Sequence, residues 1–270
     1  MTSLATPTRP LGDLLREWRQ RRHLSQLALA LRADVSQRHV SFVESGRSRP
    51  TREMVLLLAE HLDMPLRERN RLLLSAGYAP VFPERPLHDP ALHVARRAVD
   101  LVLKGHEPYP ALAVDRHWTL QAANRAIAPL FAGADASLLQ APVNVLRLSL
   151  HPDGLAPRIV NLAEWRAHLL ARLRHQIDTS GDPMLVELLA ELSGYPAHNA
   201  HRAAAPVVVP DEASVVVPLQ LTSDAGILSL ISTTTVFGTP VDVTVSELAL
   251  ECFYPANDAT TELLLGMAPA

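Results

Sequence analysis

The first 80 residues carry the side chains best suited to binding a polyanion. They hold thirteen arginines and no lysine against eight acidic residues, so this segment has a formal charge of +5, whereas the rest of the chain carries −8. Gln26 stands at the start of a predicted helix, where its amide and the free backbone N–H groups can contact a phosphate. A basic segment joined to an acidic one indicates that only the basic segment meets a nucleic acid.

Residue types that support metal binding or catalysis are present elsewhere, but their spacing favours neither. His198 and His201 have a His-x-x-His spacing, yet no carboxylate or cysteine stands beside them at a ligand spacing. Asp115, His117 and Ser149 supply the residue types of a catalytic triad, but the chain has no Gly-x-Ser-x-Gly nucleophile elbow. It also lacks a Walker loop and a Gly-x-Gly-x-x-Gly motif. We therefore expect no enzyme activity, no metal and no cofactor.

The composition predicts a folded protein of a reducing compartment. Hydrophobic residues make up 48% of the chain and charged residues 20%, which excludes a largely disordered protein. The single cysteine, Cys252, excludes a disulfide framework, and its apolar surroundings in the sequence predict an inert buried thiol. Because no stretch approaches 18 apolar residues and the N-terminal residues lack the order of a secretory signal, we expect a cytoplasmic protein with no membrane contact.

Five short helices are predicted to position the basic side chains of residues 1–80. Ser25 and Ser36 can cap helices over 26–33 and 37–45, and Gly46 can end the second of these. Asp34 is expected to take the left-handed conformation that closes the helix before it. Leu11, Leu14, Leu15 and Trp18 share one apolar face and predict another helix. Thr51 can cap a fourth helix. The fifth is predicted to have Pro65 in its first turn and to end at Gly77.

The helices over 26–33 and 37–45, with the tight turn between them, have the spacing of a helix-turn-helix. In such a unit the first helix crosses the phosphates, the second enters the major groove, and the turn holds the angle between them. Ala30 is small enough for close helix contact, and Val35 can fill the turn. The sequence therefore predicts an all-α DNA-binding domain over residues 1–80.

The segment SQLALALRADVSQRHVSFVESGRSRP strongly resembles the Cro/repressor-like family of helix-turn-helix proteins, also called the XRE family. The shared positions are Ser-Gln at 25–26, Leu-Ala at 29–30, Val-Ser at 35–36 and Glu-x-Gly-Arg at 44–47, followed by Pro50. The sequence departs from the family at 27–28, where Leu-Ala replaces an acidic pair, and at Asp34, which replaces a glycine. The resemblance implies binding to double-stranded DNA.

The resemblance also implies which side chains contact DNA. Gln37 and Arg38 open the recognition helix and would face base edges, because Gln can pair with adenine and Arg with guanine. An exposed arginine is otherwise only a solvated charge, and Phe42 is as consistent with core packing as with a thymine methyl. Glu44 is expected to bond backbone or a nearby arginine. Further candidates are His39 and Ser41 for bases, and Gln26, Arg47, Ser48 and Arg49 for phosphates.

Residues 79–90, APVFPERPLHDP, hold four prolines in twelve positions and predict a linker. A helix is predicted from Ala91 to Lys104, so we assign 81–106 to linker and connecting helix and 107–270 to a second domain. In that domain, two strands are expected within 111–124 and two amphipathic helices over 159–177 and 183–193. Further strands are predicted at 207–210, 214–222, 227–237 and 241–245, with a hairpin turn at 224–226; the pattern at 247–255 leaves a final strand open.

Four segments of this domain resemble the MmyB-like regulator family, which joins an XRE-type domain to a PAS-like, α+β ligand-binding domain. They are EPYPALAVDRHWTLQAAN, NVLRLSLHPDGLAPRIVNLAEW, GDPMLVELLAELSGYP and FGTPVDVTVSELALECFYPANDATTELL. The sequence departs from the family in LAEW, where a second tryptophan is common. The resemblance implies a repressor-like regulator with a hydrophobic ligand, of which fatty acids are the best-known kind.

An antiparallel sheet that faces several amphipathic helices forms a natural apolar pocket. Aromatic residues make up only 4% of the chain, so a pocket with aliphatic walls would suit an acyl chain better than a stacked ring. Each lining candidate is also consistent with ordinary core packing. The candidates are Trp118, Phe131, Leu146, Trp165, Leu169, Leu188 and Phe253.

The sequence thus predicts a ligand-responsive repressor that binds DNA as a homodimer, since paired modules on half-sites one helical turn apart bury more surface than one module. Two other hypotheses stay open. The first 80 residues could form a protein-interaction bundle, or they could regulate a fused small-molecule enzyme.

Overall fold

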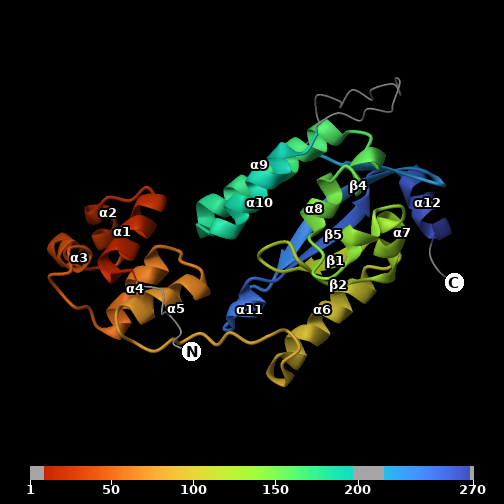
Figure 1. The fold of residues 1–270 in the computed structure, drawn as a ribbon. Helices are drawn as coiled ribbons and strands as arrows, with labels where there is room; N and C mark the ends of the chain where they lie inside the picture. Colours follow the sequence, from red (N-terminus) through yellow and green to blue (C-terminus); the bar gives the residue numbers. More distant parts are fainter. Residues whose placement is uncertain (1–8, 197–215, 268–270) are drawn as a thin grey trace, which may run out of the picture. The chain divides into compact units, whose positions relative to one another are not determined.

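The computed structural model describes residues 9–196 and 216–267, which fall into two compact units (Figure 1). The first unit comprises Met1–Pro86, Asp178–Ser180 and Thr239–Ser246, and the second comprises Leu87–Ile177, Gly181–Gly238 and Glu247–Ala270. The expected division at residues 80 and 106 stays a prediction. His198, His201 and the strand predicted at 207–210 lie outside the described residues.

The first unit contains the five predicted helices. They are α1 (Leu11–Arg21), α2 (Gln26–Arg32), α3 (Gln37–Glu44), α4 (Arg52–His61) and α5 (Leu66–Ser75). Their buried faces form one hydrophobic core around residues such as Leu15, Trp18, Leu29, Val40 and Leu58.

The local signals for these helices are confirmed. Ser25, Ser36 and Thr51 each accept a hydrogen bond from the backbone N–H three residues later. Asp34 takes the left-handed conformation with a φ of 51°, as predicted for the turn between α2 and α3. Pro65 stands one position earlier than predicted, at the N-cap of α5.

The second unit is an antiparallel five-stranded sheet with helices on both faces, which confirms the predicted α+β fold. Its strands are β1 (Ala111–Val114), β2 (Leu120–Ala123), β3 (Leu219–Ser223), β4 (Gly226–Val236) and β5 (Ala249–Pro255), in the order β2-β1-β5-β4-β3. Its helices are α6 (His93–Gly105), α7 (Ala128–Phe131), α8 (Val145–Leu150), α9 (Leu162–Ser180), α10 (Pro183–Gly194) and α12 (Asp258–Met267). Short 3₁₀ turns lie at Pro90–Leu92, Arg125–Ile127, Ala136–Leu139 and Ala156–Arg158.

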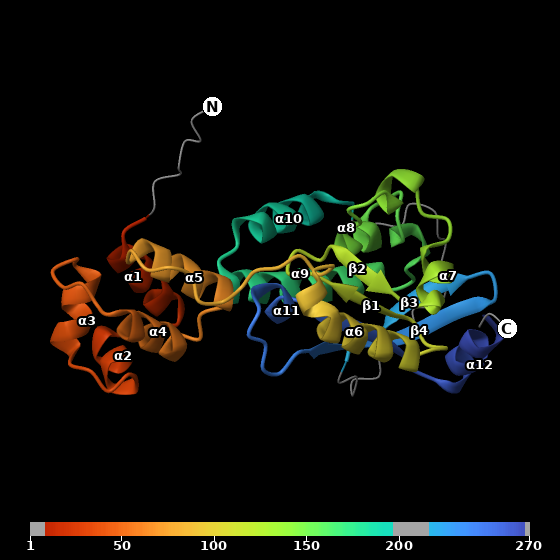
Figure 2. The same ribbon diagram turned by 90° about the horizontal axis from the view of Figure 1, so that it is seen from below.

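Alternating strand residues divide the second unit into two layers. Ala111 and Ala113 of β1 pack with Val99 and Leu103 of α6 on one face of the sheet. Figure 2 shows α6 beside β1. Leu112 of β1 faces the other way and joins the larger core that includes α8, α9 and α10. This period-2 alternation places the cavity described below on the α9 side of the sheet.

The strand predicted at 241–245 is absent, and residues 243–245 instead belong to α11 (Val243–Ser246), a single turn between β4 and β5 in the chain. The prediction was wrong because a local cap outweighs the β-branched side chains. Asp242 Oδ1 accepts a hydrogen bond from the N–H of Thr244, and the carbonyl of Asp242 accepts one from Ser246.

The ends of the sheet also differ from the predictions. Of the strand predicted over 214–222, residues 214–215 lie outside the described residues. Among the described residues the strand begins at Leu219, just after Pro218, which has no N–H to give to a ladder. The hairpin turn at 224–226 is confirmed, and the open pattern at 247–255 contains β5. The short helices α7, α8, α11 and α12 were not predicted. Within the described residues, no helix is long and apolar enough to cross a membrane.

Candidate nucleic-acid interface and ligand pocket

The inner side of α3 is fixed by a buried ion pair. Arg19 of α1 donates from Nε and Nη2 to the two carboxylate oxygens of Glu44 at 2.6 and 2.9 Å. Gln26 donates from Nε2 to Glu44 Oε2 at 2.9 Å. The side chain of Glu44 has no exposed surface, so the expected structural role of this residue is confirmed and helices α1, α2 and α3 meet at one carboxylate.

A close backbone approach seals the same point. A Cβ atom added to Gly12 would lie 2.3 Å from the carbonyl oxygen of Glu44, so only glycine lets α1 reach the end of α3. Arg16 Nη2 donates to that carbonyl at 3.1 Å. Burial alone would raise the pKa of Glu44, but hydrogen bonds from Arg19 and Gln26 and the charges of Arg19 and Arg16 outweigh it and lower that pKa.

The outer side of α3 presents the residues predicted to read bases. Gln37 and Arg38 are exposed, and Ser41 is half-buried. His39 is half-buried, and its Nε2 atom is buried with no hydrogen-bond partner among the described residues. The structure therefore places Gln37 and Arg38 better for a base edge than His39.

Phe42 supports two arginines rather than the core. The guanidinium of Arg38 lies 5.0 Å from the centre of its ring, and that of Arg47 lies 5.9 Å from it. The ring is half-buried and does not belong to the hydrophobic core of the first unit. Phe42 thus holds cations from both ends of α3 at cation–π distance.

The four phosphate candidates differ in accessibility. Arg47 and Arg49 are exposed, and Ser48 is half-buried. The N–H groups of Arg47 and Ser48 both donate to the carbonyl of Phe42, which fixes the chain just after α3. Gln26 is half-buried and gives one of its two N–H donors to Glu44, a role that the sequence did not predict.

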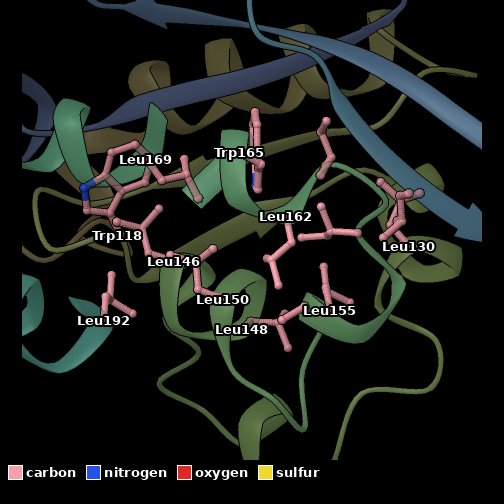
Figure 3. Packing of buried hydrophobic residues seen from close by; sticks show 14 of the residues in the cluster. Trp118, Leu130, Leu146, Leu148, Leu150, Leu155, Leu162, Trp165, Leu169 and Leu192 are labelled. Carbon is pink, nitrogen blue, oxygen red and sulfur yellow. The ribbon is translucent and has the colours of Figure 1, made fainter. Parts of the chain in front are cut away.

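The second unit contains a cavity between the sheet and helices α8 and α9. The volume of this cavity is about 70 Å³. Figure 3 shows buried side chains of both helices packed together, among them Leu146 of α8 and Trp165 and Leu169 of α9. Six of the seven predicted lining residues do line it; Leu188 of α10 is buried in the same core but lies away from the cavity. The six are Trp118, Phe131, Leu146, Trp165, Leu169 and Phe253.

The cavity walls are more aromatic than expected. Its described lining has nine aliphatic, four aromatic and four polar or charged residues. The aromatic ones are the two tryptophans and two phenylalanines among the predicted residues, so four of the thirteen apolar lining residues are not aliphatic. This small volume suits a slim chain better than a bulky molecule.

The charged part of the wall was not predicted from the sequence. Arg172 of α9 donates from Nη1 to Glu251 Oε2 at 3.0 Å and from Nη2 to Glu251 Oε1. Thr234 Oγ1 accepts from Arg172 Nη2 at 2.7 Å and donates to Glu251 Oε1 at 2.9 Å. The only available signal was Glu251 itself, because it alternates along β5 with Ala249 and Phe253 and so shares their inner face.

Trp118 is held in a conformation that bulky residues rarely adopt. Its φ is +66°, in the left-handed region. Asp115 Oδ1 fixes the turn by accepting from the N–H groups of His117 and Thr119, and Trp118 Nε1 donates to Gln176 at 2.8 Å. The guanidinium of Arg172 lies 4.7 Å from the Trp118 ring centre. Backbone strain at a cavity-lining residue is typical of functional sites.

The triad considered from the sequence is not assembled. His117 Nε2 contacts Asp182 Oδ2 at 2.9 Å, and Ser149 Oγ accepts from the indole N–H of Trp165 at 3.1 Å. Over the described ranges, no three His, Cys, Asp or Glu side chains form a group that could hold a metal. Cys252 is a buried free thiol whose pKa is raised by burial.

Comparisons with known proteins agree with both units. Residues 95–265 match the model of the MmyB-like transcription regulator ligand binding domain, and residues 15–69 match a helix-turn-helix model. A protein of Methanoculleus marisnigri that bears the name of an HTH-type transcriptional regulatory protein is 36% identical over 116 residues. The match covers 41% of this chain and 37% of that protein, so the chain spans little more than a third of its relative.

Proposed function

The chain belongs to the transcription regulators that join a helix-turn-helix domain to an MmyB-like ligand-binding domain, and from this premise we propose that it is a repressor controlled by a small hydrophobic ligand. The first unit binds DNA and the second binds the ligand. The observation that carries the proposal is the two-sided construction of α3. One side is fixed by Glu44, and the other presents Gln37 and Arg38 to the outside.

In the proposed complex, α3 enters the major groove and its first residues read the sequence. Arg38 donates to O6 and N7 of a guanine, and Gln37 pairs with an adjacent adenine. The ring of Phe42 contacts the guanidinium groups of Arg38 and Arg47 before DNA binds, so these side chains lose less conformational entropy on binding. Arg47 and Arg49 contact phosphates and set the register of the helix.

Replacing Arg38 with Ala tests this reading. The expected loss is about 1–3 kcal/mol of binding to the specific operator, with little change on random DNA. The operator is first selected from the DNA around the gene, and affinities are measured by fluorescence anisotropy at one salt concentration. Arg71→Ala removes the same charge from an exposed position on α5 and serves as the control. Equal losses for the two variants would contradict base reading by Arg38.

The second part of the proposal is the ligand, for which we expect a fatty-acid-like molecule with an extended acyl chain. The support is a slim cavity with a mainly aliphatic lining next to two tryptophans. Native mass spectrometry of protein purified from its own host should reveal a bound mass that is absent after delipidation. A protein that is always free of ligand and binds no added acyl compound would contradict this part.

We further propose that the protein acts as a homodimer that reads two half-sites. A single recognition helix buries too little surface for typical operator affinity, whereas two modules one helical turn apart supply it. The ligand controls DNA binding by favouring one arrangement of the two modules over another. Analytical ultracentrifugation should give twice the chain mass, and deletion of the gene should raise transcription from the operator; a monomer on DNA or lower transcription would contradict these points.

A further inference from the structure

We propose that the segment Thr239–Ser246, called the strap below, transmits ligand binding in the second unit to the DNA-binding unit. The strap belongs to the first unit, although the residues on both sides of it in the chain belong to the second. This inference rests on the proposed ligand control of DNA binding and names the segment through which that control acts.

The strap connects two strands that line the cavity. It follows β4 and precedes β5, and these two strands are neighbours in the sheet. Ser232 of β4 and Glu251 and Phe253 of β5 belong to the cavity lining. Only residues 237–238 separate β4 from the strap, and only residues 247–248 separate the strap from β5. A ligand that shifts either strand therefore acts on the strap through a very short stretch of chain.

Buried groups fix the strap within the first unit. The N–H of Val243 donates to the carbonyl of Pro83 at 2.8 Å, and Val243 has no exposed surface. Arg85 donates from Nη1 to Asp242 Oδ2 at 3.1 Å, and the side chain of Asp242 is only 6% exposed. Separation of this pair would leave a poorly solvated carboxylate without its cation, so the strap is tied firmly to residues 83–85.

The stretch of chain that receives the strap is itself held by α5. Asn70 of α5 donates from Nδ2 to the carbonyl of Phe82 at 2.7 Å, and its Oδ1 accepts from the N–H groups of Val81 and Phe82. The strap helix α11 also packs against α5. Because α5 shares its hydrophobic core with α3, a shift of the strap acts on the packing that positions the recognition helix.

The cavity lies entirely in the second unit and α3 lies in the first, so ligand control of DNA binding needs a physical link between them. The chain passes between the units at residues 86–87, around residues 178–180 and at both ends of the strap. Residues 178–180 end α9 and are followed by α10, which contributes no residue to the described lining. The strap has a cavity-lining strand on either side and is therefore the link on which two parts of the lining act together.

The test lengthens the strap without removing an anchor. Insertion of Gly-Gly between Gly238 and Thr239, which are both exposed, adds slack between β4 and α11. The same insertion between Asp224 and Ala225 lengthens the exposed turn between β3 and β4 and is the matched control. The affinity of the full chain for the operator is measured by fluorescence anisotropy with and without saturating decanoate. Tryptophan fluorescence confirms that decanoate binds, because Trp118 and Trp165 line the cavity.

We expect decanoate to change the operator Kd of the original protein and of the control by about tenfold, and that of the strap insertion by less than about twofold. All three proteins should still bind both operator and decanoate, because neither insertion lies in a proposed binding site. This pattern is a loss of communication rather than a loss of either site, which a merely structural role of the strap would not produce.

A substitution tests the same link at its anchor. Asp242→Asn keeps an oxygen that can cap α11 but weakens the pair with Arg85, and it should lower the effect of decanoate to about threefold. Asp135→Asn is its control, because Asp135 Oδ1 caps a turn of the second unit with the same spacing, through the N–H of Ser137. Asp135→Asn should leave the tenfold effect unchanged.

The outcomes separate this inference from the function on which it rests. If the strap insertion keeps the full effect of decanoate, transmission by the strap is wrong while ligand control stands. If the insertion abolishes operator binding and Asp242→Asn keeps the full effect, the strap is only part of the fold and the inference is also wrong. If decanoate does not bind the original protein, or binds without changing its operator affinity, the proposed control by an acyl ligand is wrong and the strap inference falls with it.

Discussion

Each unit buries one glutamate against one arginine, but the two pairs have different surroundings. Around Glu44, the Arg19 side chain is 11% exposed, Gln26 adds a hydrogen bond to the carboxylate, and Gly12 closes the backbone above it. Around Glu251, the Arg172 side chain is 28% exposed and the pair forms part of a cavity wall. The first pair is enclosed by protein on every side that the contacts describe, whereas the second has one side open to the cavity.

The difference shows that the same chemistry can stand in a closed core or at a cavity wall. A buried ion pair is worth little as net stability, but removal of one partner leaves an uncompensated charge. In the first unit that dependence joins α1, α2 and α3, and so fixes the helix that faces DNA. In the second unit the same dependence keeps Arg172 and Glu251 together in the cavity wall. The surroundings, rather than the pair itself, distinguish the two.

The largest expected effect comes from making the same substitution in both pairs. Glu44→Gln leaves the nearly buried Arg19 charge unpaired and should lower the unfolding free energy of the first unit by about 3 kcal/mol. Glu251→Gln should cost about 1 kcal/mol, because Arg172 reaches solvent and keeps its contact with Trp118. Hydrogen exchange of peptides from α1–α3 and from β4–β5 measures each unit separately. Equal costs would remove the distinction between the two pairs.

A smaller effect is expected from the glycine that closes the first pair. Gly12→Ala forces its Cβ against the carbonyl of Glu44, so α1 must move and the first unit should lose about 1–3 kcal/mol. Gly105→Ala is the matched control, because no heavy atom lies within 4 Å of a Cβ built there. Protection of α1 peptides in hydrogen exchange is the measurement. If Gly12→Ala is as harmless as Gly105→Ala, the first pair is less tightly enclosed than its contacts indicate.

The sequence predicts what local chemistry decides. The caps at Ser25, Ser36 and Thr51 and the left-handed Asp34 depend on neighbours within a few residues, so the first unit is predicted almost completely. Six cavity residues were found because amphipathic faces imply which side is buried. The error at 241–245 also has a local cause, the Asp242 cap, which outweighed β-branched side chains.

What the sequence did not predict depends on distant partners. Arg172 and Glu251 are 79 positions apart and meet only because β5 pairs with β1 and β4 in the middle of the sheet. Arg19 and Glu44 come together through the packing of α1 on α3. No local pattern identifies the arginine that pairs with either glutamate, and this is why the charged wall of the cavity emerged only from the fold.

A third Arg–Glu pair, exposed rather than buried, allows the comparison to be tested by pH. Arg147 of α8 contacts both oxygens of Glu191 of α10 at 2.7 Å, and Tyr195 donates its hydroxyl to the same carboxylate. These hydrogen bonds, that from Arg147 above all, outweigh partial burial and lower the pKa of Glu191 to about 2. Since the side chain is 36% exposed, solvent screening limits the contribution to about 1 kcal/mol or less.

The sign of the pH effect follows from the lowered pKa. A carboxyl group whose pKa is lower in the folded state stabilises that state above its unfolded pKa, here 4.5, and this stabilisation disappears as the pH falls toward 2. At neutral pH, the peptides of α8 and α10 should therefore be better protected from hydrogen exchange in the original protein than in Glu191→Gln. This difference in protection should shrink below pH 4.5. Glu187→Gln removes an exposed charge one turn away and controls for net charge. A difference that stays constant with pH would show that this pair acts by packing rather than by its charge.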